Sequence, residues 1–100
     1  MREWSFISSH GAVLAVIAKN PQLTALEIST AVGIRERGVR RIIADLIADG
    51  YVRKTSVGRR NQYEVNEDIP LQRPMMSHIR VGELLQVLLP LINTVSVDRE

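Results

Sequence analysis

The sequence predicts a mainly α-helical domain that carries one small β-hairpin, and three observations lead to this fold class. Capping residues and helix-ending glycines divide the first half of the chain into three short helical segments. A β-prone stretch with a glycine turn follows them, and a leucine- and valine-rich segment lies near the C-terminus. With 100 residues, of which 45% are hydrophobic, the chain is long enough for one domain with a modest core.

The first predicted helix begins near Ser8 or Ser9, either of which can cap it. It runs to about Lys19, where Asn20 and Pro21 end it. Its apolar positions include Val13, Leu14, Val16 and Ile17.

The second predicted helix, residues 25–32, is bounded at both ends. Thr24 and Glu27 form a capping box, in which each side chain accepts a hydrogen bond from a backbone N–H group at the helix start. Gly33 supplies the left-handed residue that commonly ends a helix.

The third predicted helix runs from about Glu36 to Asp49, and Gly50 stops it. Its apolar side chains fall within roughly 140° of the helical wheel and form one stripe. The stripe consists of Val39, Ile42, Ile43, Leu46 and Ile47. The opposite face carries Arg37, Arg41, Ala44 and Ala48, and Arg40 lies on the flank. We therefore expect the stripe to pack on the core and the arginines to face solvent.

A hairpin is predicted next, with strands over 51–57 and 61–65 and a turn at 58–60. Three helices followed by a hairpin is the element order of a winged helix-turn-helix, in which the second helix of the pair joined at the turn can enter a DNA major groove. The predicted domain spans residues 1–66, and an added C-terminal helix follows it.

The C-terminal part is predicted as a linker over 67–74, a helix over 75–92 that is regular from about Met75 to Leu89, and a flexible tail over 93–100. This helix is apolar on so many sides that a small core cannot bury them all. We expect a two-fold interface with a second copy of the chain. The residues expected there are Ile79, Leu84, Leu85, Leu88 and Leu89. The alternative is that the helix caps the core of its own domain.

Several short motifs occur in the order found in one group of regulators. They are Leu26-Glu27-Ile28 and Val32-Gly33-Ile34 at the turn, Val39 to Leu46 with Gly50-Tyr51-Val52 in the third helix and first strand, and Gly58 to Tyr63 at the hairpin tip. Residues 10–65 thereby resemble the winged helix-turn-helix domains of bacterial and archaeal transcription regulators of the MarR and ArsR type. The resemblance implies a recognition helix in the major groove, a wing on the backbone or minor groove, and a dimer. Arg35 departs from the pattern, since such helices often start with Ser or Thr.

The positive charge is concentrated in the middle of the chain. Residues 35–60 hold eight basic and three acidic side chains, a net charge of +5, whereas the rest of the chain carries −3. A basic segment on an otherwise acidic chain indicates a surface for a polyanion, and the alternative is a solvated face with ordinary ion pairs.

Four arginines within seven residues are the main candidates for DNA contact. They are Arg35, Arg37, Arg40 and Arg41. Arg37 and Arg41 form a like-charge pair at i,i+4, which destabilises a helix by a few tenths of a kcal/mol, about 0.2–0.5. We expect Glu36 to pair with Arg40 and Asp45 with Arg41, which offsets this cost only in part. Arginine can bond guanine O6 and N7 with two hydrogen bonds, so DNA would complete the surface.

The predicted wing adds a second basic group. Arg59 and Arg60 at the turn can straddle a phosphate or enter a narrow minor groove. Arg53 and Lys54 are expected to give general electrostatic support.

Other function classes find little support in the sequence. Cysteine is absent, and only His10 and His78 carry an imidazole, so we expect no metal site and no metal sensing of the ArsR kind. No nucleophile motif or glycine-rich phosphate loop is present, so we expect neither an enzyme nor a cofactor. No apolar run reaches the 18 residues of a membrane span, and the N-terminus lacks the apolar stretch of a signal peptide, so we expect no membrane partner and a cytoplasmic location.

The sequence thus predicts a sequence-specific, double-stranded DNA-binding transcription regulator that acts as a homodimer. The alternative is a winged-helix module whose basic face binds an acidic protein partner. A steep fall of affinity with salt on DNA distinguishes the first reading from the second.

Overall fold

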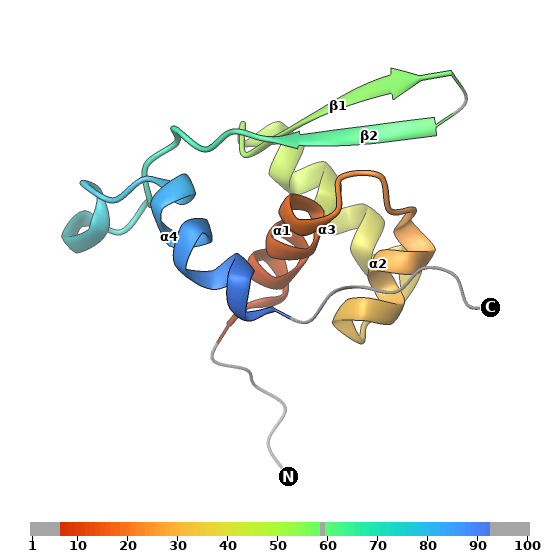
Figure 1. The fold of residues 1–100 in the computed structure, drawn as a ribbon, viewed down its shortest axis with the longest axis horizontal. Coiled ribbons are helices and arrows are strands. Elements are labelled where there is room, and N and C mark those ends of the chain that lie inside the picture. Colours follow the sequence, from red (N-terminus) through yellow and green to blue (C-terminus); the bar gives the residue numbers. More distant parts are fainter. Residues whose placement is uncertain (1–6, 59, 93–100) are drawn as a thin grey trace, which may run out of the picture.

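The computed structural model describes residues 7–58 and 60–92, with the backbone only for Val57 and Arg60. The elements are α1 (Ser9–Lys19), α2 (Ala25–Val32), α3 (Glu36–Ala48), β1 (Val52–Val57), β2 (Arg60–Val65), η1 (Pro74–Met76), α4 (Val81–Leu88) and η2 (Leu89–Leu91) (Figure 1). Three helices, an antiparallel hairpin and one further helix make a winged helix-turn-helix with a C-terminal addition, which confirms the predicted fold class.

The first two helices start and end as their sequences predict. Ser8 Oγ accepts a hydrogen bond of 3.1 Å from the backbone N–H of Gly11. At α2, Thr24 Oγ1 accepts from the Glu27 N–H at 3.1 Å, and Glu27 Oε1 accepts from the Thr24 N–H at 2.9 Å. Gly33 then ends α2 with φ of 87°, a backbone conformation that costs other residues more than glycine. Both capping predictions are confirmed.

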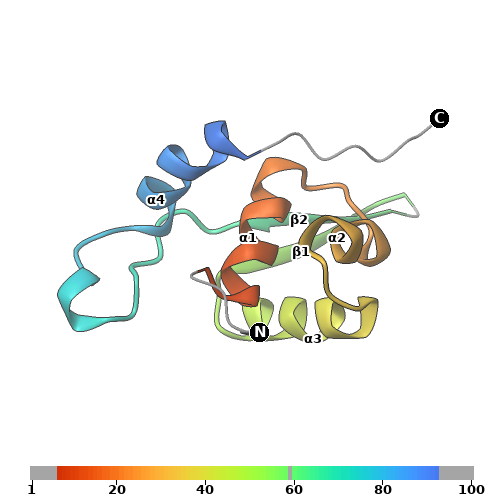
Figure 2. The same cartoon turned by 90° about the horizontal axis from the view of Figure 1, so that it is seen from below.

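The core lies where α1 meets α2, α3 and the hairpin. Helix α1 contacts α2, α3 and β2, and Figure 2 shows it between α3 and α4. The side chains with the least exposure are Val13, Ile17, Ile28 and Val39. The Tyr63 N–H in β2 also donates to the Pro21 carbonyl at 3.2 Å, so the loop between α1 and α2 is tied to the hairpin.

The hairpin has a tighter turn than predicted. The register pairs Val52 with Val65 at the base and Val57 with Arg60 at the tip, so only Gly58 and Arg59 lie between the strands. Arg60 therefore belongs to β2 and not to the turn. The physical reason is the φ of 64° at Gly58, which lets the chain reverse within two residues.

The prediction that the C-terminal helix begins at Met75 is wrong. After the 3-10 turn η1 the chain turns again at residues 77–78, and residues 79–81 then pair through their backbone with residues 69–71. The Leu71 N–H donates to the Ile79 carbonyl and the Val81 N–H to the Ile69 carbonyl, each at 2.9 Å. Helix α4 starts only at Val81, so the connection after the hairpin continues through residue 80.

Helix α4 is packed against its own domain. Val81 and Leu85 are buried in the core that α1 helps to form. The Gly82 N–H donates to the Glu67 carbonyl at 2.9 Å, and a Cβ at Gly82 would lie 2.8 Å from the Cβ of Glu67. Leu85 was expected in a subunit interface, and this expectation is wrong, because a side chain buried in its own core is not available to a second copy.

Candidate nucleic-acid interface

Helix α3 presents two arginines on the side opposite its buried stripe. Val39, Ile42, Ile43 and Leu46 are buried, as predicted, whereas Ile47 at the edge of the stripe is 38% exposed. Arg37, Arg41, Ala44 and Ala48 are all exposed. Within residues 7–58 and 60–92, no ion pair involves Arg37 or Arg41. The centre of the exposed face thus offers two guanidinium groups between small side chains.

The two carboxylates on the flanks of this face have partners. Glu36 Oε2 lies 2.5 Å from Nη2 of Arg40, which confirms the expected i,i+4 pair. Asp45 Oδ2 instead lies 2.9 Å from Nε2 of His10 in α1. The expected pairing of Asp45 with Arg41 is therefore not the one that forms, because α1 brings an imidazole to the same carboxylate. His10 thereby ties the start of α1 to α3.

The start of α3 lacks a side-chain cap. Arg35 occupies the N-cap position with extended backbone angles, φ −71° and ψ 151°, and its side chain makes no capping hydrogen bond. Arginine, which stands here where such helices often have Ser or Thr, thus leaves the backbone N–H groups of the first turn without a side-chain acceptor at the N-cap. The exposed Arg35 side chain is the basic group at the point where the chain turns from α2 into α3.

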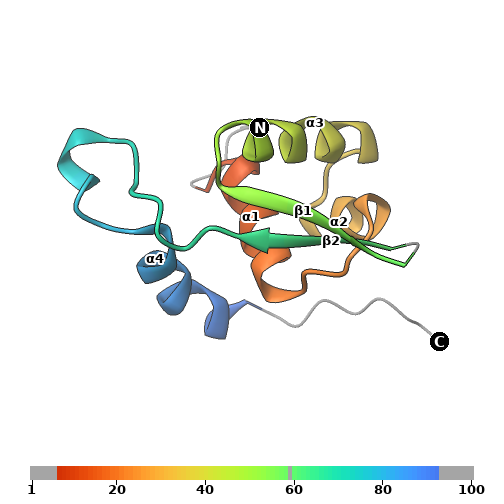
Figure 3. The same ribbon diagram turned by 90° about the horizontal axis from the view of Figure 1, so that it is seen from above.

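The hairpin extends on the same side as the N-terminal end of α3. Figures 2 and 3 show β1 running back along α3, so that the tip of the hairpin and the start of α3 point in the same direction. The backbone of Arg60 lies at this tip. Arg59 lies outside the described residues, so the predicted contacts of these two arginines stay predictions.

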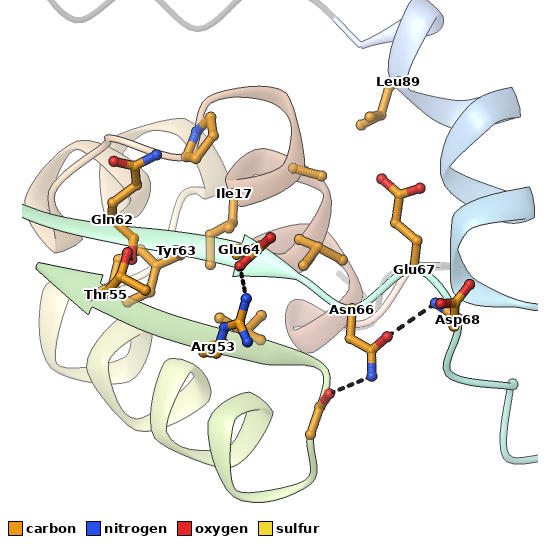
Figure 4. A pocket seen from close by; sticks show the side chains of 15 residues that line it. Ile17, Arg53, Thr55, Gln62, Tyr63, Glu64, Asn66, Glu67, Asp68 and Leu89 are labelled. Atoms are coloured by element: carbon orange, nitrogen blue, oxygen red, sulfur yellow. Dashed lines mark hydrogen bonds and ion pairs between the residues drawn. The ribbon is translucent and has the colours of Figure 1, made fainter.

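The two basic residues in β1 differ in their surroundings. Arg53 forms an ion pair with Glu64 across the hairpin, as Figure 4 shows. Lys54 is opposite Tyr63 in the register, and because side chains alternate along a strand, it lies on the other face from Arg53. In the described part of the chain Lys54 has no ion pair. Of these two residues, Lys54 is therefore the one whose charge no carboxylate of the described residues neutralises.

A hollow of about 900 Å³ lies beside the hairpin, between the end of α1, the segment that follows β2, and η2 (Figure 4). Ile17, Tyr63, Glu67 and Leu89 are among the residues that line it. Nearby, Lys19 Nζ donates to the Leu89 carbonyl at 3.0 Å and holds η2 to the end of α1. Sequence reasoning missed this hollow, because its wall comes from distant segments with no shared motif.

Among residues 7–58 and 60–92, no helix is long and apolar enough to span a bilayer. These residues also contain no group of three or more His, Cys, Asp or Glu side chains placed to hold a metal ion.

In a comparison with known protein families, a match covers the helical part of this surface. Residues 9–53 match a family described as winged helix-turn-helix DNA-binding. The match runs from α1 to the first residues of β1 and contains Arg35, Arg37, Arg40 and Arg41. The search of curated proteins found no match. The more specific resemblance to regulators of the MarR and ArsR type stays a prediction.

Proposed function

We propose that the protein is a transcription regulator that binds specific double-stranded DNA sites with α3 in the major groove. The observation that carries the proposal is the exposed face of α3, where Arg37 and Arg41 have no ion-pair partner in the described residues. A groove about 12 Å wide admits a helix, and Ala44 and Ala48 let the helix axis approach the base edges closely. The chain would act in the cytoplasm beside its DNA, like the MarR- and ArsR-type proteins that residues 10–65 resemble.

Each arginine has a proposed role that follows from its place. Arg37 and Arg41, at the centre of the face, read or grip the major groove, and Arg40 contacts it from the flank. Arg35, which precedes the helix, contacts the backbone or the minor groove. The like-charge pair of Arg37 and Arg41 disfavours the free helix by about 0.2–0.5 kcal/mol, and DNA phosphates or guanine edges would relieve this repulsion.

Selection of bound sites from a pool of random duplexes tests the proposal directly. We expect one enriched sequence, with an affinity that falls steeply as salt rises, because bound arginines release counterions from the phosphates. Enrichment of a palindrome would support a symmetric dimer as well. If no duplex binds even in low salt, the basic face serves an acidic protein partner instead, and the proposal is wrong.

The wing is expected to supply affinity without sequence preference. Replacing Arg59 and Arg60 with alanine should weaken binding to all duplexes alike and reduce the salt slope by about one to two units, since point charges at a hairpin tip suit phosphates better than base edges. Affinities for the selected site and for a scrambled duplex over a range of salt measure both quantities. A double variant that keeps its affinity but prefers a new site would contradict this role.

The proposed dimer uses the outer face of α4 and η2. Leu84, Val87 and Leu91 are 49%, 67% and 77% exposed, and their i, i+3, i+7 spacing places them on one side of a helical segment. Leu88 and Leu89 are half-buried at the margin of the core, and Ile79 is half-buried in the connection. Figure 2 shows α3 and α4 on opposite sides of α1, so pairing through α4 would leave both α3 faces free for half-sites about 34 Å apart.

Two charges on this face should therefore separate the subunits. We expect the double variant Leu84→Glu, Val87→Glu to sediment at 11.2 kDa and the wild type at twice that mass. Affinity for a palindromic site should fall by about 10²-fold, because two linked half-sites become one. Truncation before Met75 is a poorer test, because it also removes Val81 and Leu85 from the core. A wild-type species of 11.2 kDa that binds the palindrome tightly would contradict the proposed dimer.

A further inference from the structure

The ion pair between Glu36 and Arg40 is unusual for a helix that is proposed to approach phosphates. Glu36 is half-buried, with 39% of its side chain accessible, whereas Arg40 is exposed, with 68% of its side chain accessible. The carboxylate stands in the first turn of α3, on the side of Arg40 that is nearer to the buried stripe. A carboxylate so close to Arg40 weakens the attraction of this arginine for phosphates, but it also restrains the orientation of the guanidinium group.

The position of the pair separates it from the other arginines of α3. At 100° per residue, Arg40 lies about 80° from the centre of the exposed face that Arg37 and Arg41 occupy, and Glu36 lies about 120° from it, beside the buried stripe. The opposite flank holds Asp45, which is paired with His10. Among residues 7–58 and 60–92, Arg40 is thus the one arginine of α3 that a carboxylate holds, and the carboxylate holds it from the side of the buried stripe.

We infer that Glu36 is a positioning residue for the base specificity of this protein: its carboxylate holds Arg40 in the orientation that binds a guanine in the major groove. The inference rests on the proposed function, and it names the two side chains that give the preference at one base pair. Arginine donates to guanine O6 and N7, so an Arg40 side chain held in one orientation would favour a G·C pair at one position of the site. Because the ion pair with Glu36 already restricts the rotamers of Arg40, this side chain loses less conformational entropy when it binds a base.

The simpler role of Glu36 would be structural. A carboxylate in the first turn of a helix favours the helix dipole, and a Glu-to-Arg pair at i,i+4 stabilises an isolated helix slightly. That role affects the melting temperature but leaves the preferred base unchanged. Base preference is therefore the measurement that separates the two roles.

The test compares variants by affinity for the selected duplex and for duplexes with single base-pair changes. We expect Glu36→Gln to lose preference at one position by about tenfold, the size of one bidentate contact, while binding to scrambled DNA rises. Glu36→Asp keeps the charge at the helix start but shortens the side chain, and it should lose the same preference. Arg40→Ala should lose it too, and adding Glu36→Gln to Arg40→Ala should cost nothing further at that position.

Asp45→Asn is the matched control, because it removes the same charge from the other flank of α3. It should leave the preference at that position intact. An unchanged base preference in both Glu36 variants would overturn the inference, as would a uniform loss over all duplexes on Arg40→Ala, which marks a phosphate contact. A wild-type chain that binds no duplex would overturn the proposed function and this inference together, so the two failures are distinguishable.

Discussion

Replacing Arg37 and Arg41 with alanine should weaken specific DNA binding strongly while leaving the fold intact or slightly more stable. Each arginine that contacts a base edge contributes about 1–3 kcal/mol, so each single variant should lose about 5- to 150-fold in affinity. The free protein should gain stability, because the substitutions remove a like-charge pair and introduce the best helix former. Gel-shift titration and thermal unfolding followed by circular dichroism measure the two effects.

Arg73→Ala is a suitable control for this experiment. Arg73 is an exposed arginine at the start of η1, in the connection on the far side of the molecule from α3 (Figure 1). The same charge is removed there, so any loss caused by net charge alone should appear equally in this variant. Equal affinities of the Arg37, Arg41 and Arg73 variants would remove α3 from its proposed role in reading DNA.

Ile28→Ala should destabilise the domain by about 2–5 kcal/mol, which is a large fraction of the 5–15 kcal/mol typical of a small domain. Ile28 has no exposed surface and lies in α2 within the core, and α2 packs on both α1 and α3. The loss combines the transfer free energy of the removed atoms with the cavity that they leave. Urea unfolding measures this difference. The slope of the unfolding free energy against urea concentration should be the same in both proteins.

Leu26→Ala is the matched control on the same helix. Leu26 is 59% exposed, so its truncation should change the free energy of unfolding by less than about 0.5 kcal/mol. Similar losses in the two variants would mean that α2 does not pack as the structure describes. DNA binding by Ile28→Ala should fall only in proportion to its unfolded fraction.

Local rules account for the helices and for the main basic face. The ends of α1 and α2 depend on Ser8, Thr24 and Gly33, which act on backbone groups within a few residues of themselves. The face of α3 depends on its 3.6-residue period, so the exposed positions of Arg37 and Arg41 follow from their spacing. These features were readable in the sequence because each involves neighbours along one segment.

Contacts between distant segments account for the features that the sequence pattern did not reveal. The backbone of residues 69–71 pairs with residues 79–81 and delays the start of α4, which a leucine-rich pattern cannot indicate. Packing against α1 buries Leu85 and leaves Leu84 in solvent, although both are equally apolar. Similarly, Asp45 pairs with His10, 35 residues away, and not with Arg41 one turn away. Periodicity tells which side chains share a face of a helix, but the partner of that face depends on how the chain folds back on itself.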